Sequence, residues 1–329
     1  MMRPCFGAAS TQPCVAPSQR RDAVQITRAL AAGLDIRLQH VVSSIEYGGG
    51  RVTVSCANGG VFSGHACVVT IPIGCLQVGL HFGSTPGDAM PHVIPRVCVR
   101  ACLCAHAVTA QLGAVPRYWS RCRIPLLRGY LQAGDVRFVP PLPASKTAAI
   151  NQLGMGVLNC LTLVFPAKFW PDDSHLWTPF SYGDLNIYDC CHCCKNAVLQ
   201  VHRTGRAAAR WETLSDAEIV SEAMDALRHA FPKQAAHIPA PLAATYTRWQ
   251  SDPFSKGSYS FARVGGSRRS FSQCAQPVGT TLFFAGEHCH AEYNATVHGA
   301  LMSARDTAKQ VRQVFNFSGK LQRPCFKLL

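Results

Sequence analysis

The chain has 329 residues, 48% of them hydrophobic, which excludes an intrinsically disordered protein and allows one large core or two moderate ones. Its formal net charge of +14 suggests nucleic acid as a partner, but no RNA-binding signature, zinc finger or basic heptad helix accompanies the charge. We therefore expect no nucleic-acid partner. No run of about eighteen apolar residues occurs, so we also expect no membrane-spanning helix.

The first 27 residues contain only scattered apolar side chains and no secretory segment, and we treat residues 1–27 as a tail of uncertain structure. We expect an intracellular protein, placed in the cytoplasm, with the nucleus and the peroxisome as open alternatives.

Residues 28–76 are typical of strands. Apolar and polar residues alternate around Ile36, Val42 and Val52, and Asn58-Gly59 indicates a tight hairpin. The apolar run at residues 66–71 predicts a strand that is buried on both faces. This part of the chain is therefore expected to form a three-stranded meander that feeds a central strand.

The next stretch, residues 77–132, breaks this pattern. From residue 78 onward it has six arginines, no lysine and no glutamate, and it keeps neither a helical nor a strand period. A structureless insertion of this length is uncommon inside a compact domain. We interpret it as an irregular insertion of translated intron sequence; a genuine loop specific to this lineage is the alternative.

Residues 133–279 mix helices and strands. A proline-rich stretch leads into a helix, and a strand is predicted at residues 157–165. Ser215 and Glu218 form the capping box of a clear amphipathic helix, which Pro232 ends. Residues 280–314 then give a buried strand and a closing helix, with residues 315–329 as a tail. The apolar face of the closing helix is expected to hold Val297, Ala300, Leu301, Ala304, Ala308 and Val311.

Seventeen cysteines in a chain without a secretory segment do not indicate a disulfide framework. The densest group is Cys190, Cys191, His192, Cys193 and Cys194. A zinc site normally needs two separated ligand pairs. Cys98, Cys102 and Cys104 are the alternative source of a second pair, but we interpret all of these as reduced thiols and expect no metal.

The final strand, its Gly286-Glu287 turn and the closing helix form a site suited to an anionic or dinucleotide cofactor. Glu287 can hydrogen-bond a sugar hydroxyl, and the N–H groups from Ala295 to Val297 can face a phosphate or a ring carbonyl. A tight crossover turn without any ligand is the alternative interpretation of the same architecture.

The amino-acid sequence of this unit identifies a protein family more specifically than its strand-turn-helix architecture does. Residues 283–288 (FFAGEH) and 293–300 (YNATVHGA) resemble the C-terminal flavin signature of flavin-containing amine oxidases, the family of polyamine oxidases and lysine-specific histone demethylases. The resemblance recurs, in the family's order, at residues 69–76, 153–159, 165–170 and 247–260, and it covers roughly 28–76 and 133–314. It implies an α+β, two-domain flavin amine oxidase fold (α/β in its cofactor half), with an incomplete FAD-binding domain and a mixed-sheet substrate-binding domain.

The same resemblance implies FAD as the cofactor and a role for several residues. Glu287 would bind the ribose, and Thr296 and Val297 would contact the flavin end. The backbone of Val42 would meet the adenine. Tyr259 would line an aromatic cage that orients the amine, since a flat aromatic wall favours a cation and excludes water from hydride transfer.

Two departures from the family pattern affect the expected activity. At the catalytic position where the family usually has a lysine after Leu-Asn, this chain has Cys160, and a neutral thiol cannot replace that cation; Lys168 belongs to another motif and is not a substitute. No G-x-G-x-x-G between a strand and a helix is found either, and Gly154-Met155-Gly156 leads into a strand. The cradle for the pyrophosphate is therefore expected to be missing.

The resemblance implies FAD-dependent oxidation of amines, polyamines first, by hydride transfer to the flavin with release of hydrogen peroxide. A small-molecule amine and oxygen are the expected partners, and a chromatin partner is expected only if the chain belongs to the histone-demethylase branch. The alternatives are a catalytically impaired or truncated remnant without tightly bound flavin, the histone-demethylase-like branch, and a basic scaffold for acidic partners. An open groove that exposes apolar faces of the meander and the last helix is expected where the missing unit would pack.

Overall fold

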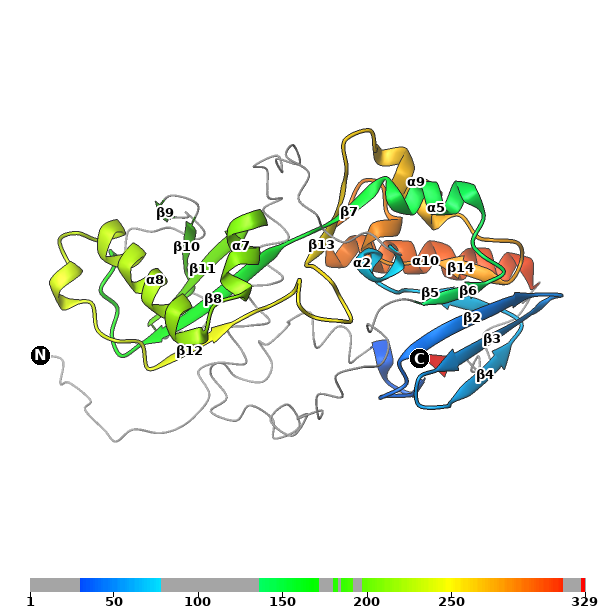
Figure 1. Cartoon of the computed structure of the whole chain (residues 1–329), viewed down its shortest axis with the longest axis horizontal. Helices are drawn as coiled ribbons and strands as arrows, with labels where there is room; N and C mark the ends of the chain where they lie inside the picture. Colours follow the sequence, from blue (N-terminus) through cyan, green and yellow to red (C-terminus); the bar gives the residue numbers. More distant parts are fainter. Residues whose placement is uncertain are drawn as a thin grey trace, which may run out of the picture.

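The computed structural model describes residues 30–77, 136–171, 180–182, 185–191, 197–315 and 327–328. These residues form two lobes placed end to end along the long axis of the molecule (Figure 1). The first lobe contains residues 30–77, 136–156 and 259–315, and the second contains residues 157–258. Apart from Gln77, the segment expected to be an irregular insertion lies outside the described residues.

A four-stranded sheet forms one side of the first lobe. Its strands follow the order β4-β3-β2-β6; they are β2 (Val42–Gly48), β3 (Arg51–Cys56), β4 (Val61–Gly64) and β6 (Arg137–Val139). The first three are antiparallel neighbours and form a three-stranded meander over residues 42–64, which does not include the strand expected around Ile36. At the hairpin, the Asn58 side chain accepts a hydrogen bond from the Gly60 N–H at 3.0 Å, and Gly59 adopts a φ of +83°.

The central strand is less enclosed than expected. Strand β5 (Cys67–Val69) pairs in parallel with β14 (Leu282–Phe284), and all three residues of β14 are buried. Val68, however, is 37% exposed. The prediction of burial on both faces is therefore wrong for β5, because within the described residues the core covers only the face that holds Val69. Strands β1 (Asp35–Ile36) and β15 (Lys327–Leu328) form a separate, short parallel pair.

The closing helix, α10 (Val297–Val314), turns a different face to the core than its apolar residues indicate. Its buried residues are Gly299, Ser303, Thr307 and Val311, whereas Ala304 and Ala308 are exposed. The reason is hydrogen bonding: Ser303 Oγ accepts from the Gly286 N–H at 3.0 Å, and Thr307 Oγ1 donates to the Phe284 carbonyl at 2.9 Å. Small hydroxyl side chains let the helix lie directly against the end of β14.

Three helices and two strands complete the core of the first lobe. They are α2 (Ile73–Leu76), α5 (Ala144–Asn151), α9 (Arg268–Ala275), β7 (Leu153–Gly156) and β13 (Tyr259–Ala262). Ile150, Leu153 and Phe271 share one apolar cluster with Ile45 and Phe284. Residues 136–156 and 259–279 therefore pack with the cofactor half, a different division from the expected substrate-binding domain at 133–279.

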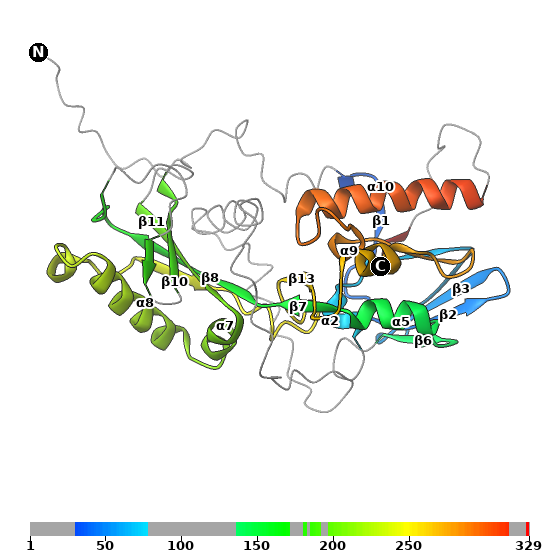
Figure 2. The same cartoon turned by 90° about the horizontal axis from the view of Figure 1, so that it is seen from above.

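The second lobe is a five-stranded sheet covered by helices on one face (Figure 2). The strand order is β12-β8-β11-β10-β9; the strands are β8 (Leu158–Phe165), β9 (Phe180–Tyr182), β10 (Leu185–Asp189), β11 (Ala197–Thr204) and β12 (Ala243–Tyr246). The covering helices are α7 (Gly205–Glu212) and α8 (Asp216–Ala230). Leu163, Leu199 and Trp211 belong to the apolar cluster between sheet and helices.

The two lobes are joined by two stretches that run beside each other (Figure 1). One continues from β7 into β8, and the other returns from β12 to β13. Strand β13 pairs antiparallel with β7, and the Ser258 hydroxyl both accepts from the Leu158 N–H and donates to the Leu158 carbonyl, each at 2.8 Å. None of the described helices is both long and apolar enough to cross a membrane.

The expected capping box of α8 is present. The Glu218 N–H donates to Ser215 Oγ at 3.3 Å, and the Ser215 N–H donates to Glu218 Oε2 at 2.8 Å.

We predict that Ser215→Ala lowers the free energy of unfolding by about 1 kcal/mol, because the first turn loses its cap. Ser221→Ala, at an exposed position inside the same helix, should leave stability unchanged or slightly higher. Urea unfolding of both variants checks this; equal losses would contradict it.

Candidate functional site

Glu287 lies at the centre of the candidate site. Strand β14 ends in Gly286, whose φ of +137° turns the chain into a short 3-10 helix (Glu287–Cys289). The Glu287 carboxylate accepts the Ser260 N–H at 3.1 Å, the Ser260 hydroxyl at 2.6 Å and the Ala295 N–H at 2.6 Å. Burial raises the pKa of Glu287, and these three hydrogen bonds oppose that rise. The carboxylate therefore ties β13 to the turn that precedes α10.

The N-terminus of α10 is held tightly in place. Buried Thr296 caps the helix: its hydroxyl accepts from the Gly299 N–H at 3.0 Å and donates to the Tyr293 carbonyl at 2.6 Å. Gly299 is required because a methyl group there would overlap the Tyr293 carbonyl. An α-helix gives its first N–H groups no internal partner, so those of Val297 and His298 are available to a ligand. The Val297 side chain is 42% exposed at this end.

The expectation that N–H groups from Ala295 onward face a ligand needs one correction. The Ala295 N–H donates to Glu287 Oε2. Ala295 takes a positive φ of +61°, which lets the chain turn towards the carboxylate. The open donors of this turn therefore begin later, at the first residues of the helix.

Tyr259 lies near Glu287 because the next residue in the chain, Ser260, is hydrogen-bonded to the Glu287 carboxylate. It stands opposite Gly156 in the β7–β13 pair, and Ser260 beside it is the residue bound by Glu287. Since successive side chains of a strand point to opposite faces, Tyr259 and Ser260 face opposite ways. The structure thus brings Tyr259, Glu287, Thr296 and Val297 into one region of the first lobe. Their roles toward the cofactor stay predictions.

Cys160 lies further along, on β8 in the second lobe. Its thiol is buried, and its N–H donates to Thr247 Oγ1 at 2.9 Å. It belongs to a row of buried polar side chains on the sheet face opposite the helices. Sγ lies 3.9 Å from Thr162 Oγ1, Gln200 Nε2 donates to Thr162 Oγ1 at 3.2 Å, and the Gln200 side chain lies 3.4 Å from His202 Nε2.

Sequence reasoning missed this polar row, although a signal was present. Polar residues alternate with leucine or valine at Cys160 and Thr162 on β8, and at Gln200 and His202 on β11. His202 pairs directly across from Cys160, and its ring lies 4.7 Å from that of Tyr188. The period of two in both segments would have placed these side chains on one face.

Val42 packs against the apolar cluster that also holds Phe284 and Cys289. It begins β2, is half-buried and pairs with Cys56 in the four-stranded sheet. Its expected contact with an adenine stays a prediction. Of the cysteine-rich group, Cys190 is buried and Cys191 half-buried, whereas His192, Cys193 and Cys194 lie outside the described residues.

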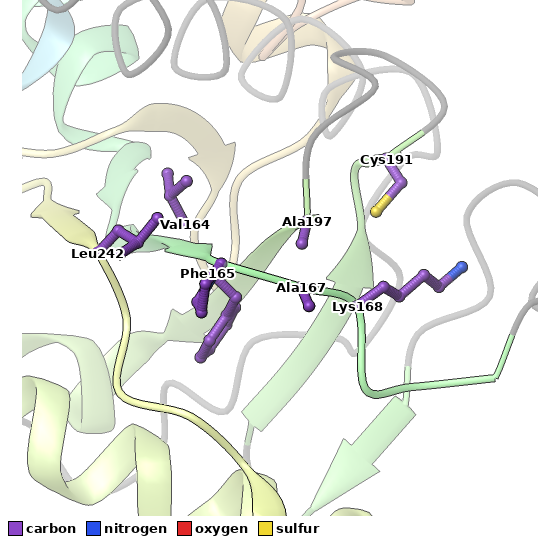
Figure 3. A pocket seen from close by; sticks show the side chains of 8 residues that line it. Val164, Phe165, Ala167, Lys168, Cys191, Ala197 and Leu242 are labelled. Atoms are coloured by element: carbon purple, nitrogen blue, oxygen red, sulfur yellow. The ribbon is translucent and has the colours of Figure 1, made fainter. Parts of the chain in front are cut away.

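An open hollow of about 540 Å³ lies elsewhere, on the second lobe, and none of the expected site residues lines it (Figure 3). Phe165, Lys168 and Cys191 are among its lining residues. Lys168 Nζ lies 3.1 Å from the Asp189 carboxylate. Burial alone would raise the pKa of Asp189, but hydrogen bonds from Cys191 and Lys168 outweigh it and hold that pKa at about 2. Lys168 is therefore engaged here and not beside Cys160.

A buried amine supports the strand that leads into the site. Lys146 of α5 is 5% exposed, and its Nζ donates to the carbonyls of Gln273, Cys274 and Gln276 at the end of α9. Nζ also lies 4.1 Å from the ring centroid of Phe284 in β14. Burial lowers the pKa of Lys146 to about 8. A cation at a helix C-terminus is favourable, but this one has lost its water.

Comparison with known proteins identifies relatives of this arrangement. The family described as flavin containing amine oxidoreductase matches residues 21–100 and 126–312. A "Lysine-specific histone demethylase 1 homolog 1" from Oryza sativa subsp. japonica is 36% identical over 215 residues, covering 62% of this chain and 24% of the relative. "Lysine-specific histone demethylase 2" from Homo sapiens is 28% identical over 297 residues, covering 87% of this chain and 29% of the relative.

Solved structures agree on the fold. A putrescine oxidase variant superposes with a TM-score of 0.60 at 18% identity, covering 88% of this chain and 52% of that one. Cyclohexylamine oxidase from Brevibacterium oxydans gives 0.57 at 16% identity, covering 83% and 48%. The flavin amine oxidase fold predicted from the sequence is therefore confirmed. The chain spans about half the length of these oxidases and about a quarter of the length of the curated relatives.

The lowered pKa of Lys146 predicts a pH-dependent stability. The unfolded chain holds this proton up to about pH 10.5, whereas the folded chain releases it near pH 8, so unfolding binds a proton between these values. The contribution of Lys146 to the free energy of unfolding should rise with pH by about 1.4 kcal/mol per unit in that window. Urea unfolding at pH 7.5 and 9.5 should show that the free energy of unfolding of wild type, relative to that of Lys146→Met, increases as the pH rises. The exposed Lys309→Met control should show no such gain; equal slopes would refute the assignment.

Proposed function

Because the chain belongs to the family of flavin-containing amine oxidoreductases, we propose that it carries the flavin-facing and amine-facing part of an FAD-dependent amine oxidase. The observation that supports this most directly is the Glu287 unit. One half-buried carboxylate joins the strand of Tyr259 to the N-terminal turn of the helix that Thr296 caps. A residue suited to orient an amine and a helix end suited to face an electron-rich ring are thereby fixed to each other.

The residues present fit part of an FAD. The first turn of α10 offers N–H groups and the positive end of a helix dipole, which favour an anion or a ring carbonyl. Gly299 lets the Tyr293 carbonyl lie close to the first turn of the helix, which keeps the cap in place. Val297, at 42% exposure, leaves that end open. Thr296 and Val297 would hold the flavin end, and Glu287 would face the sugar.

FAD, when bound, supplies a hydride acceptor. Tyr259 would orient the amine so that the carbon next to nitrogen faces that acceptor, and its ring would keep water away from the reacting carbon. Cys160, at the family's lysine position, places a buried thiol on β8 and not a cation. We therefore propose slower use of oxygen as the final acceptor, with hydrogen peroxide as the product.

Two amine classes are candidates for the substrate. The motifs of the chain favour polyamines, and a putrescine oxidase shares the fold. The curated relatives named above are lysine-specific histone demethylases, which favours a modified lysine side chain as the second candidate. Both are amines whose carbon next to nitrogen can lose a hydride.

Purified chain with added FAD tests the proposal. Flavin absorbance that remains with the protein after gel filtration, bleaching under anaerobic conditions with an amine, and peroxide release in air are the expected results. Spermine and spermidine form one arm, and a peptide with dimethylated lysine forms the other. A chain that retains no flavin, or flavin that no amine bleaches, would favour the non-catalytic remnant.

Charge at the open end of α10 gives a separate prediction. Val297→Glu places a carboxylate beside the first-turn N–H groups, where it should stabilise the helix but repel an electron-rich cofactor. We expect the dissociation constant for FAD to rise about tenfold, which corresponds to about 1.4 kcal/mol. Val297→Gln, of the same size without charge, should stay within about twofold of wild type. Flavin fluorescence titration measures both, and equal effects of the two variants would refute this placement of FAD.

A further inference from the structure

We propose that Glu212 is a positioning residue which, together with Asn159, fixes the segment that leads into Tyr259. The segment is residues 247–258, the return connection from β12 in the second lobe to β13 in the first. The inference rests on the proposed amine oxidation, because the residue that it positions is the one expected to orient the amine.

The Glu212 carboxylate, at the end of α7, is fully engaged by neutral donors. Oε1 accepts from Asn159 Nδ2 at 2.6 Å and from the Gln250 N–H at 2.9 Å. Oε2 accepts from the Ser251 N–H at 2.8 Å and from the Ser251 hydroxyl. No lysine or arginine among the described residues forms an ion pair with it. A carboxylate with four such donors imposes a position, because the donors must converge on it.

Asn159 extends this arrangement by one residue. It is fully buried, and its Oδ1 accepts from the Trp249 N–H and from Thr247 Oγ1, both at 3.1 Å. The consecutive N–H groups of Trp249, Gln250 and Ser251 are thus all held by the Asn159–Glu212 pair. Asn159 also stands directly before Cys160 on β8, so this pair joins the segment to the strand that holds the thiol.

Backbone hydrogen bonds connect the fixed residues 249–251 to Tyr259. The Gly257 N–H donates to the Trp249 carbonyl at 2.8 Å, which closes the segment into a loop. Gly257 has a φ of +146°, and a side chain there would strike Met155. The Ser258 N–H then donates to the Gly156 carbonyl at 2.7 Å, opposite Tyr259. A displacement of the Trp249 backbone is therefore expected to displace Tyr259 as well.

Glu222 offers a matched control in the same lobe. Its carboxylate accepts from Trp211 Nε1 at 2.7 Å and pairs with Arg210 and Arg203. These partners belong to α7 and β11. Substitution of either glutamate removes strong hydrogen bonds from the second lobe, but of the two only Glu212 hydrogen-bonds the 247–258 segment.

The experiment compares Glu212→Gln with Glu222→Gln in the full chain loaded with FAD. A glutamine amide cannot accept from all four donors, so we expect the limiting rate of anaerobic flavin reduction by the amine to fall about 10- to 100-fold. The dissociation constant for FAD should stay within about twofold, because Glu287 and α10 are untouched. Glu222→Gln should keep both constants within about twofold of wild type, even where it lowers the melting temperature.

Hydrogen exchange supplies a readout that does not depend on turnover. The amides of Trp249, Gln250 and Ser251 should exchange faster in Glu212→Gln and not in Glu222→Gln. A normal reduction rate in Glu212→Gln would overturn the positioning role, and so would a loss of FAD binding in parallel with the rate. Wild type that binds FAD but is reduced by no amine would instead overturn the proposed function, a result that the variants cannot produce.

Discussion

The structure of the candidate site depends on a carboxylate that is largely shielded from water. Glu287 follows a fully buried strand, so its oxygens must find donors within the protein or lose much of the hydration energy of a charge. Ser260 and Ala295 provide those donors, one from β13 and one from the turn before α10. Meeting this single requirement fixes the distance between the strand of Tyr259 and the helix end.

In the second lobe, the carboxylate of Glu212 also fixes a segment by accepting hydrogen bonds from a serine. Glu212 holds the N–H and hydroxyl of Ser251 much as Glu287 holds those of Ser260. The connection between the lobes is therefore held near both of its ends by a glutamate–serine pair. Between them, Asn159 and Ser258 bind the same connection to β8. The site is thus a product of both lobes, although most of the expected cofactor contacts lie in the first.

Local sequence signals predicted local structure well. The capping box of Ser215 and Glu218 and the hairpin at Asn58-Gly59 depend on partners a few residues apart, which the sequence places side by side. The buried face of α10 could not be found this way. Ser303 and Thr307 face inward because they bond the backbone of Gly286 and Phe284, and nothing in the period of the helix indicates those distant partners. The apolar pattern of the helix instead predicted that Ala304 and Ala308, which are exposed, face the core.

The site shows the same division. Motif resemblance selected Glu287, Thr296 and Tyr259, and the structure brings them together. Glu212 was missed because its donors come from β8 and from residues 250–251, far along the chain, and a glutamate at the end of a helix looks like an ordinary solvated residue. The sequence also did not indicate that the expected substrate-binding domain divides at residues 156 and 259, since this division depends on which core the helices α5 and α9 join.

The paired connections between the lobes also limit how the molecule can move. Two adjacent strands that are hydrogen-bonded to each other, and locked at Leu158 by one serine hydroxyl, resist bending about a single point. A hinge needs a few residues whose backbone angles can change freely. Here the residues of the return connection are held by hydrogen bonds to Asn159, Glu212 and Leu158. A hinge motion that separates the two lobes is therefore disfavoured, and in the proposed enzyme an amine would enter by side-chain rotation or loop rearrangement.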